Sequence, residues 1–299
     1  MRPSTGTRKG TAASAVPRAS WRWRPERLLR SRLFTAAVAI PLLAWLFFLA
    51  PAWIFNGVVL FSTWVALREF SLMALSSVPG AATLTTLGGM MIAASMVLVP
   101  GGLAGGAALS AGIVACLILT LVATLATARD MGQSVNSAGQ VLLGALYGGA
   151  LLPHLIWLRG LPGGDGPSWV FFVFAVVMAG DVGGYFGGKM LGTRKLWPSV
   201  SPNKTVEGSL VSFGGSLVAG ILVNSLILHR LGLFETLFVA GVMSVLAQLG
   251  DLLESMIKRA YRTKDSGWIL PGHGGVLDRT DSLVLPIVFV YYYAILVTG

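Results

Sequence analysis

The sequence has few charged residues, a single cysteine and only three histidines. Of its 299 residues, 11% are charged and only 12 are acidic, whereas 55% are hydrophobic. Soluble domains average about 25% charged residues, so an ordinary soluble domain is excluded. The lone Cys116 cannot form an intrachain disulfide, and its place inside an apolar run is typical of a small buried residue. No set of cysteine and histidine residues has the spacing of a zinc site.

Long apolar runs take the place of charge. Each has about 16 to 20 residues, close to the roughly 20 that a membrane-spanning helix needs. The runs are continuous, whereas the strands of a membrane β-barrel alternate. We therefore expect an all-α polytopic membrane protein with about nine transmembrane helices. The expected spans are roughly 33–50, 53–70, 84–99, 107–125, 139–158, 169–188, 208–229, 233–252 and 283–298.

Basic residues gather at the N-terminus. Residues 1–32 hold nine Lys and Arg against a single acid, in a chain whose net charge is +10. Their Ser, Thr, Ala, Pro and Gly content predicts a disordered cytoplasmic tail. We expect a transmembrane domain at 33–299. Attraction to anionic lipid explains the basic tail, so no nucleic-acid partner is expected.

The distribution of Lys and Arg also predicts orientation. With the N-terminus in the cytoplasm, 20 of the 22 basic residues lie on the cytoplasmic side, and only Arg159 and Arg230 lie outside. Nine spans then leave the C-terminus outside. Both long polar loops, 189–207 and 253–282, fall on the cytoplasmic face.

Charge is densest at residues 251–281, which carry five of the 12 acids. If span eight continues as helix past residue 252, Asp251, Glu254 and Lys258 share one face. Mg²⁺ typically binds one or two carboxylates together with substrate phosphates, and Asp251, Asp278 and Asp281 are the natural set. The glycine-rich turn 271–275 leaves backbone N–H groups free to meet an anion. Together with nearby cations, this pattern indicates nucleotide or phosphoryl chemistry. The cations are Lys258, Arg259, Lys264 and Arg279.

Two other segments carry candidate residues. Asp181 and Tyr185 share a face of span six, where the acid could contact metal or substrate, or be a structural acid paired with a lysine or with the tyrosine. The loop after that span could hold phosphate through its basic residues and the Ser201 and Thr205 hydroxyls, or be an ordinary cytoplasmic loop. His273 could be structural or contact phosphate.

Residues 255–281, SMIKRAYRTKDSGWILPGHGGVLDRTD, resemble the signature of the phosphatidate cytidylyltransferases, or CDP-diacylglycerol synthases. Residues 181–189 and 201–208 also resemble that family. The resemblance is firm over about 181–281 and general over the first five spans. It implies that the domain at 33–299 is a transmembrane cytidylyltransferase domain, with its catalytic half at about 169–299. The basic tail looks like an addition in this chain.

The resemblance implies transfer of CMP from CTP to phosphatidic acid, giving CDP-diacylglycerol and pyrophosphate, with Mg²⁺ and a second cation that the same carboxylates could share. It also implies a multi-pass protein of the inner (cytoplasmic) membrane, and a homodimer. The implied metal ligands are Asp251, Asp278 and Asp281. The expected catalytic residues are Asp251, Lys258, Asp278, Arg279 and Asp281. The expected substrate-binding residues are Asp181, Tyr185, Ser201, Lys204, Thr205, Glu207, Arg259, Lys264, His273, Gly274 and Gly275.

Two other functions remain open. One is a different membrane enzyme that uses CTP or a polyprenyl-type lipid, such as a lipid kinase or an archaeal-type CDP-lipid synthase. The other is a transporter with Asp181 and Asp251 as ion ligands. The transporter is less favoured because most charged residues lie in loops on one side, and because no internal repeat is evident.

Overall fold

The computed structural model describes residues 40–76, 78–267 and 275–298. The contacts group the chain from Leu43 onward into one compact unit. The predicted tail, residues 1–32, lies outside the described residues. The helices are α2 (Ala52–Ala74), α3 (Ala81–Leu98), α4 (Leu103–Thr127), α5 (Met131–Leu146), α6 (His154–Arg159), α7 (Gly166–Leu191), α8 (Val206–Val223), α9 (Leu233–Ala260) and α10 (Leu277–Thr298). Three π-helical turns join or precede them: η1 (Trp45–Leu49), η2 (Tyr147–Leu151) and η3 (Asn224–Leu228).

The all-α membrane class is confirmed. In the part of the chain that the structure describes, eight helical stretches are long and apolar enough to cross a membrane, and they correspond to predicted spans two to nine. The first predicted span, 33–50, lies partly outside the described residues, and its described part is a shorter apolar helix, Ile40–Leu49. The protein is therefore a multi-pass membrane protein.

Several helices are longer than the hydropathy pattern predicts, because polar residues extend them beyond the apolar run. The fifth stretch begins at Met131 instead of 139, where the Asp130 side chain caps the helix by accepting a hydrogen bond from the Gln133 N–H (3.0 Å). Pro153 interrupts it as expected, since proline lacks a backbone donor. α9 continues as helix to Ala260, which is the condition for Asp251, Glu254 and Lys258 to share one helix face.

The loop at 189–207 is more ordered than expected, because it contains a β-hairpin. Strands β1 (Lys195–Trp197) and β2 (Ser201–Thr205) pair antiparallel, with Lys195 opposite Thr205 and Trp197 opposite Ser201. The two prolines do keep this segment out of helix, and Pro202 is tolerated because a two-stranded sheet has only edge strands.

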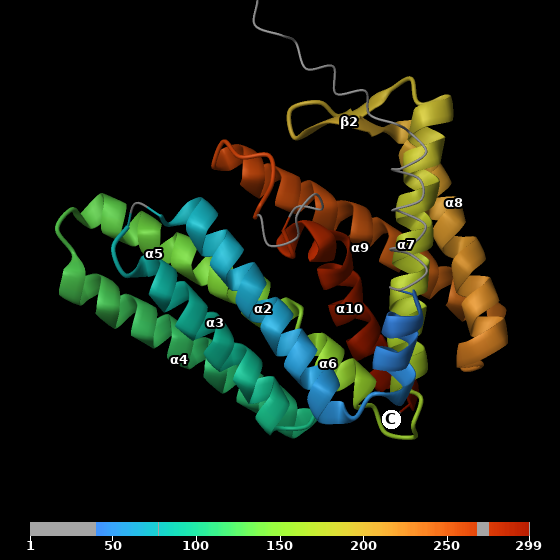
Figure 1. Cartoon of the computed structure of the whole chain (residues 1–299), viewed down its shortest axis with the longest axis horizontal. Helices are drawn as coiled ribbons and strands as arrows, with labels where there is room; N and C mark the ends of the chain where they lie inside the picture. The colour runs from blue at the N-terminus through green and yellow to red at the C-terminus, as the bar shows by residue number, and fades with distance from the viewer. Residues whose placement is uncertain (1–39, 77, 268–274, 299) are drawn as a thin grey trace, which may run out of the picture. The chain divides into compact units, whose positions relative to one another are not determined.

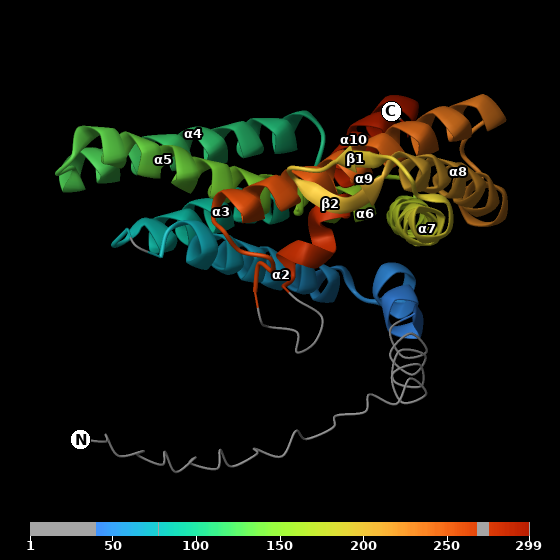
Figure 2. The same ribbon diagram turned by 90° about the horizontal axis from the view of Figure 1, so that it is seen from above.

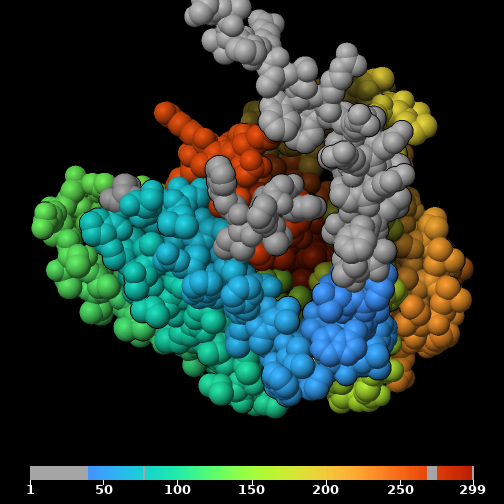
Figure 3. Space-filling model, in the orientation of Figure 1, coloured from blue at the N-terminus to red at the C-terminus, as the bar shows by residue number. Residues whose placement is uncertain are grey.

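α9 and α10 lie between the group α2–α5 and the pair α7–α8 (Figures 1 and 2). The pair α7–α8 packs through small residues: a Cβ at Gly208 would lie 3.0 Å from the Gly184 carbonyl oxygen. α10 packs against α9, α6, α7 and α2. Ile287 and Tyr291 of α10 are buried in the core with Trp169 and Met243. In the space-filling view, the red atoms of α10 are set back behind those of α2 (Figure 3).

Candidate active site

The crossing of α9 and α10 builds the centre of the site. A Cβ at Gly250 would collide with the carbonyl oxygen of Asp281, so the two backbones can approach this closely only because residue 250 is glycine. Asp251 follows directly in α9, and Asp281 lies in the second turn of α10. The fold thus brings together the two ends of the charged stretch, as the sequence predicted.

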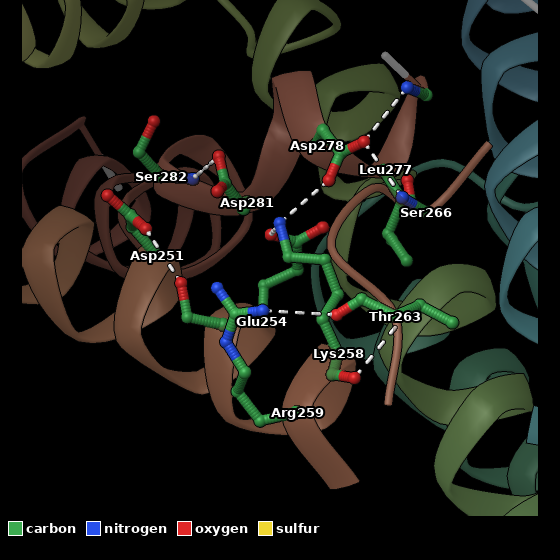
Figure 4. A network of polar contacts seen from close by, with 12 residues as sticks. Asp251, Glu254, Lys258, Arg259, Thr263, Ser266, Leu277, Asp278, Asp281 and Ser282 are labelled. Atoms are coloured by element: carbon green, nitrogen blue, oxygen red, sulfur yellow. Dashed lines mark hydrogen bonds and ion pairs between the residues drawn. The ribbon is translucent and has the colours of Figure 1, made fainter. Parts of the chain in front are cut away.

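Lys258 lies between two carboxylates (Figure 4). Its ammonium nitrogen is 2.5 Å from Glu254 Oε2 and 2.7 Å from Asp278 Oδ1. The contact with Asp278 is a hydrogen bond, whereas the Glu254 contact lacks hydrogen-bond geometry and is an ion pair only. The predicted shared face of α9 is confirmed, and the Ser255 hydroxyl donates to Asp251 Oδ1 on it (3.4 Å). Glu254 is fully buried and was not among the predicted site residues, although its i, i+4 spacing from Lys258 indicated the pair.

Asp278 holds both flanks of the segment 267–274. Its Oδ2 accepts hydrogen bonds from the backbone N–H groups of Ser266 (3.0 Å) and Gly275 (2.9 Å). Gly275 therefore offers its N–H to a carboxylate within the protein. His273 and Gly274 lie outside the described residues.

Asp181 reaches the same region from α7. Its Oδ2 accepts a hydrogen bond from the Ser282 hydroxyl (3.0 Å), one residue after Asp281. A structural role for Asp181, one of the alternatives from the sequence, predicts a lysine or Tyr185 as its partner. The hydrogen-bond partner of Asp181 is instead a serine. Tyr185 is 64% exposed and meets Phe186 edge to face, with ring centroids 5.3 Å apart.

The hairpin supplies a cation to this cluster. The Lys204 ammonium is 2.5 Å from Asp251 Oδ2. Thr205 ends β2 and caps α8, since its hydroxyl accepts the Gly208 N–H (3.1 Å).

Glu207 anchors the base of the hairpin. Its carboxylate accepts the Thr193 hydroxyl (2.7 Å) and N–H (3.1 Å), and the Arg194 N–H (3.2 Å). Ser201 begins β2 at the far end of the hairpin strand.

The other predicted phosphate contacts lie at the exposed rim. Arg259, Lys264 and Arg279 are solvent-exposed. The Arg259 guanidinium donates to the Thr263 carbonyl oxygen (3.3 Å), which holds its side chain along the end of α9.

The carboxylates suit a hard divalent cation by their chemistry. Among the described residues, however, no three His, Cys, Asp or Glu side chains converge as a ready metal site, and Lys204 and Lys258 occupy oxygens of Asp251 and Asp278. An ionised carboxylate has about four lone-pair sites, so Asp278 keeps one beyond its three hydrogen bonds. The ligand set Asp251, Asp278 and Asp281 stays a prediction.

The sequence pattern did not identify Glu69 of α2 as part of this region. Its carboxylate accepts the N–H groups of Val276 (3.0 Å) and Leu277 (2.8 Å), about 200 residues further along the chain. In the sequence it was visible only as a charge inside an apolar run.

Comparison with known proteins agrees with the family resemblance of the sequence. The model of the cytidylyltransferase family matches residues 30–297. The chain is 32% identical over 291 residues to a phosphatidate cytidylyltransferase of Synechocystis sp. (strain ATCC 27184 / PCC 6803 / Kazusa), covering 89% of this chain and 96% of that protein. It is 34% identical over 275 residues to that of Brucella suis biovar 1 (strain 1330), covering 89% and 93%. The match to that of Bacillus subtilis (strain 168) is 42% identical over 161 residues, and spans 52% of this chain and only 58% of the relative.

Proposed function

Because the chain belongs to the cytidylyltransferase family, we propose that it transfers CMP from CTP to phosphatidic acid, giving CDP-diacylglycerol for phospholipid biosynthesis. The observation that carries this proposal is the meeting of polar side chains from four elements. Lys204 of β2 contacts Asp251 of α9, and Asp181 of α7 accepts a hydrogen bond from Ser282 of α10. Carboxylates beside lysines, at the end of a helix bundle, suit a reaction between two phosphate-bearing substrates.

The reaction needs positioning more than proton transfer. An oxygen of the lipid phosphate attacks the α-phosphorus of CTP, a new P–O bond forms, and the bond to the bridging oxygen breaks so that pyrophosphate leaves. The second pKa of a phosphate monoester is near 6, so the attacking group is already ionised at neutral pH. The site therefore has to align the two phosphates and neutralise their charge.

We assign these tasks to residues at the carboxylate cluster and its rim. Lys258 and Arg279 would neutralise the triphosphate and the departing pyrophosphate. Lys204, with the Ser201 and Thr205 hydroxyls, would hold a phosphate of CTP or lipid. The contact of Lys204 with Asp251 supports this role, because it shows that the lysine of the hairpin lies next to the carboxylates of the site. A phosphate that bound there would compete with Asp251 for the ammonium group.

Magnesium belongs to the proposal as well. Asp251, Asp278 and Asp281 would hold Mg²⁺, and a second cation could share them. The bound ion would supply positive charge to the phosphate oxygens. The other expected contacts, from Asp181, Tyr185, Glu207, Arg259, Lys264, His273, Gly274 and Gly275, remain proposals for the lining of the site.

We further propose that this site faces the cytoplasm from the inner membrane, with the N-terminus inside and the C-terminus outside. Two observations support this orientation. It places 20 of the 22 basic residues on one side. Lys204, in the polar segment 189–207, also contacts Asp251, which lies next to the polar segment 253–282. CTP would then arrive from the cytosol and phosphatidic acid from the leaflet. Homodimerisation is a further proposal, testable by the mass of the protein–detergent complex.

Labelled CTP separates the candidate reactions. Purified protein with phosphatidic acid, Mg²⁺ and CTP labelled at the α-phosphate should move label into lipid, and label at the γ-phosphate should leave as pyrophosphate. A lipid kinase would transfer the γ-label instead. A transporter would yield no lipid product and would show flux in sealed vesicles.

The carboxylate assignment is tested with Asp281→Asn. We expect kcat to fall roughly 100-fold or more, the range seen when a group that stabilises charge in the transition state is lost. Asp130→Asn is the matched control, because it makes the same chemical change at a helix cap outside the site and should leave kcat unchanged. Near-normal turnover by folded Asp281→Asn would refute the assignment.

A further inference from the structure

Glu69 is a buried acid near the C-terminal end of the membrane-spanning helix α2. Only 2% of its surface is exposed. Burying a carboxylate is costly unless its oxygens are hydrogen-bonded. Three donors meet it: the Val276 N–H on Oε1, the Leu277 N–H on Oε2 and the Ser266 hydroxyl on Oε2 (3.4 Å). Ser266 and Val276 belong to the segment that joins α9 to α10, and Leu277 is the first residue of α10.

The charge of Glu69 is balanced by the start of α10. Among the described residues, no lysine or arginine forms an ion pair with it. The first N–H groups of a helix have no partner within the helix, and the helix dipole favours negative charge there. The carboxylate therefore serves as an N-terminal cap provided by a distant helix, and it fixes the residue at which α10 begins.

The flanks of the loop are shaped around this carboxylate. A Cβ at Gly267 would collide with the Glu69 side chain, and a Cβ at Gly275 would collide with both Glu69 and the Ser266 hydroxyl. Both glycines belong to the charged stretch, and neither has a positive φ. Their lack of a side chain is thus explained by close approach to Glu69.

The same segment contacts the lysine–carboxylate pair. Ser266 donates its hydroxyl to Glu69 and its N–H to Asp278, while Gly275 donates its N–H to Asp278. Asp278 in turn holds Lys258. A shift in the start of α10 would therefore displace the lysine's partner, and Asp281 one turn later.

We infer that Glu69 is a positioning residue for catalysis, which sets the placement of the Lys258–Asp278 pair and of Asp281 by capping α10 from the N-terminal half of the chain. The inference rests on the proposed function for its catalytic consequence. Its structural half, the carboxylate cap, stands on the hydrogen bonds alone.

Glu69→Gln is the first test. The amide keeps the shape but offers one oxygen and an N–H₂ group where two oxygens now accept, so one backbone donor would face another donor. We expect kcat to fall about 10- to 100-fold, as misplacement of reacting groups does, with the KM for CTP changed less than threefold. Amide hydrogen exchange at Val276 and Leu277 should become faster. Glu69→Asp, which keeps the carboxylate, should recover part of kcat.

Glu235→Gln is the matched control. Glu235 is an exposed acid in the first turn of α9, and its Oε2 accepts the Gly232 N–H (2.9 Å). The same Glu-to-Gln change there should leave kcat, and the exchange at Val276 and Leu277, as in the wild type. Equal loss of kcat in both variants would show a general effect on folding and would overturn the inference.

A second pair keeps the test decisive if Glu69→Gln folds poorly. Gly267→Ala should lower kcat in the wild-type background, because the new methyl group meets Glu69. In the Glu69→Ala background the same change should cost much less, since the collision is gone. Equal costs in both backgrounds would overturn the inference.

The two proposals fail differently. Wild-type protein that forms no CDP-diacylglycerol would refute the proposed function. Amide hydrogen exchange at Val276 and Leu277 would then still test whether Glu69 caps α10. Active wild-type protein with fully active Glu69→Gln and unchanged exchange at Val276 and Leu277 would refute only the positioning role.

Discussion

Lys258 is the residue on which the charges of the site depend. It contacts Glu254, which is fully buried, and Asp278, whose side chain is 13% exposed. Removing water from such a group is costly, and the ion pairs offset the cost only while every partner is present. One cation thus contacts two acids in a largely apolar setting.

Lys258→Met should show this dependence. Without the ammonium group, Glu254 and Asp278 both lose the cation that they contact, so we expect a loss of about 3 kcal/mol in stability and of nearly all activity. Thermal unfolding in detergent and the CTP assay measure the two effects.

The double variant Lys258→Met/Glu254→Gln is the companion. It also replaces the buried carboxyl group of Glu254 with an amide that cannot ionise, and should recover much of the stability but none of the activity. A single variant as stable as the wild type would contradict the proposed dependence.

Among the secondary-structure elements, the crossing of α9 and α10 decides the site. Gly250 lets Asp251 approach the α10 backbone, and the hairpin brings Lys204 to the same acid. The carboxylates at this crossing come from different helices, so their spacing depends on how the helices pack.

Gly250→Ala should separate the two helices. The added methyl group meets the Asp281 carbonyl oxygen, which belongs to helix backbone and cannot move aside, so overpacking should cost about 1–3 kcal/mol and most of kcat. Gly214→Ala in α8 is the control, because nothing lies within 4 Å of its added Cβ. There alanine should leave activity unchanged and raise helix stability by up to about 1 kcal/mol. Equal effects from both substitutions would count against a special role for the crossing.

At the scale of the whole molecule, the spans arrange polar segments at opposite ends of the helices. The helix α9 begins next to Arg230 and ends next to Arg262, so these two arginines lie at opposite ends of one apolar helix. On the proposed orientation, Arg262 faces the cytoplasm and Arg230 the other side.

Cysteine labelling tests that orientation. The sequence has a single cysteine, the buried Cys116, so the Cys116→Ala variant provides a background without thiols. In inverted membrane vesicles, a membrane-impermeant maleimide should label Arg262→Cys and not Arg230→Cys, and intact cells should give the reverse. Labelling of both from one side would contradict nine spans with the N-terminus inside.

Much of this protein could be predicted without its structure. Apolar run lengths indicate membrane helices because the hydrocarbon thickness sets a length that local composition records. The pattern of 251–281 indicated the site because its residues are close in sequence, and the helical spacing of Asp251, Glu254 and Lys258 was enough to place them on one face. The hairpin was missed because its pairing depends on contacts at its base, such as those of Glu207.

By itself, the sequence determined the class of protein, the approximate spans and the stretch in which the chemistry is concentrated, since each depends on composition or local spacing. Only the tertiary structure decided which side chains meet. It showed Lys204 on Asp251, Asp181 on Ser282, and Glu69 at the start of α10. These contacts join residues from 47 to 208 positions apart, where no local periodicity records the pairing and only the packing of helices brings them together.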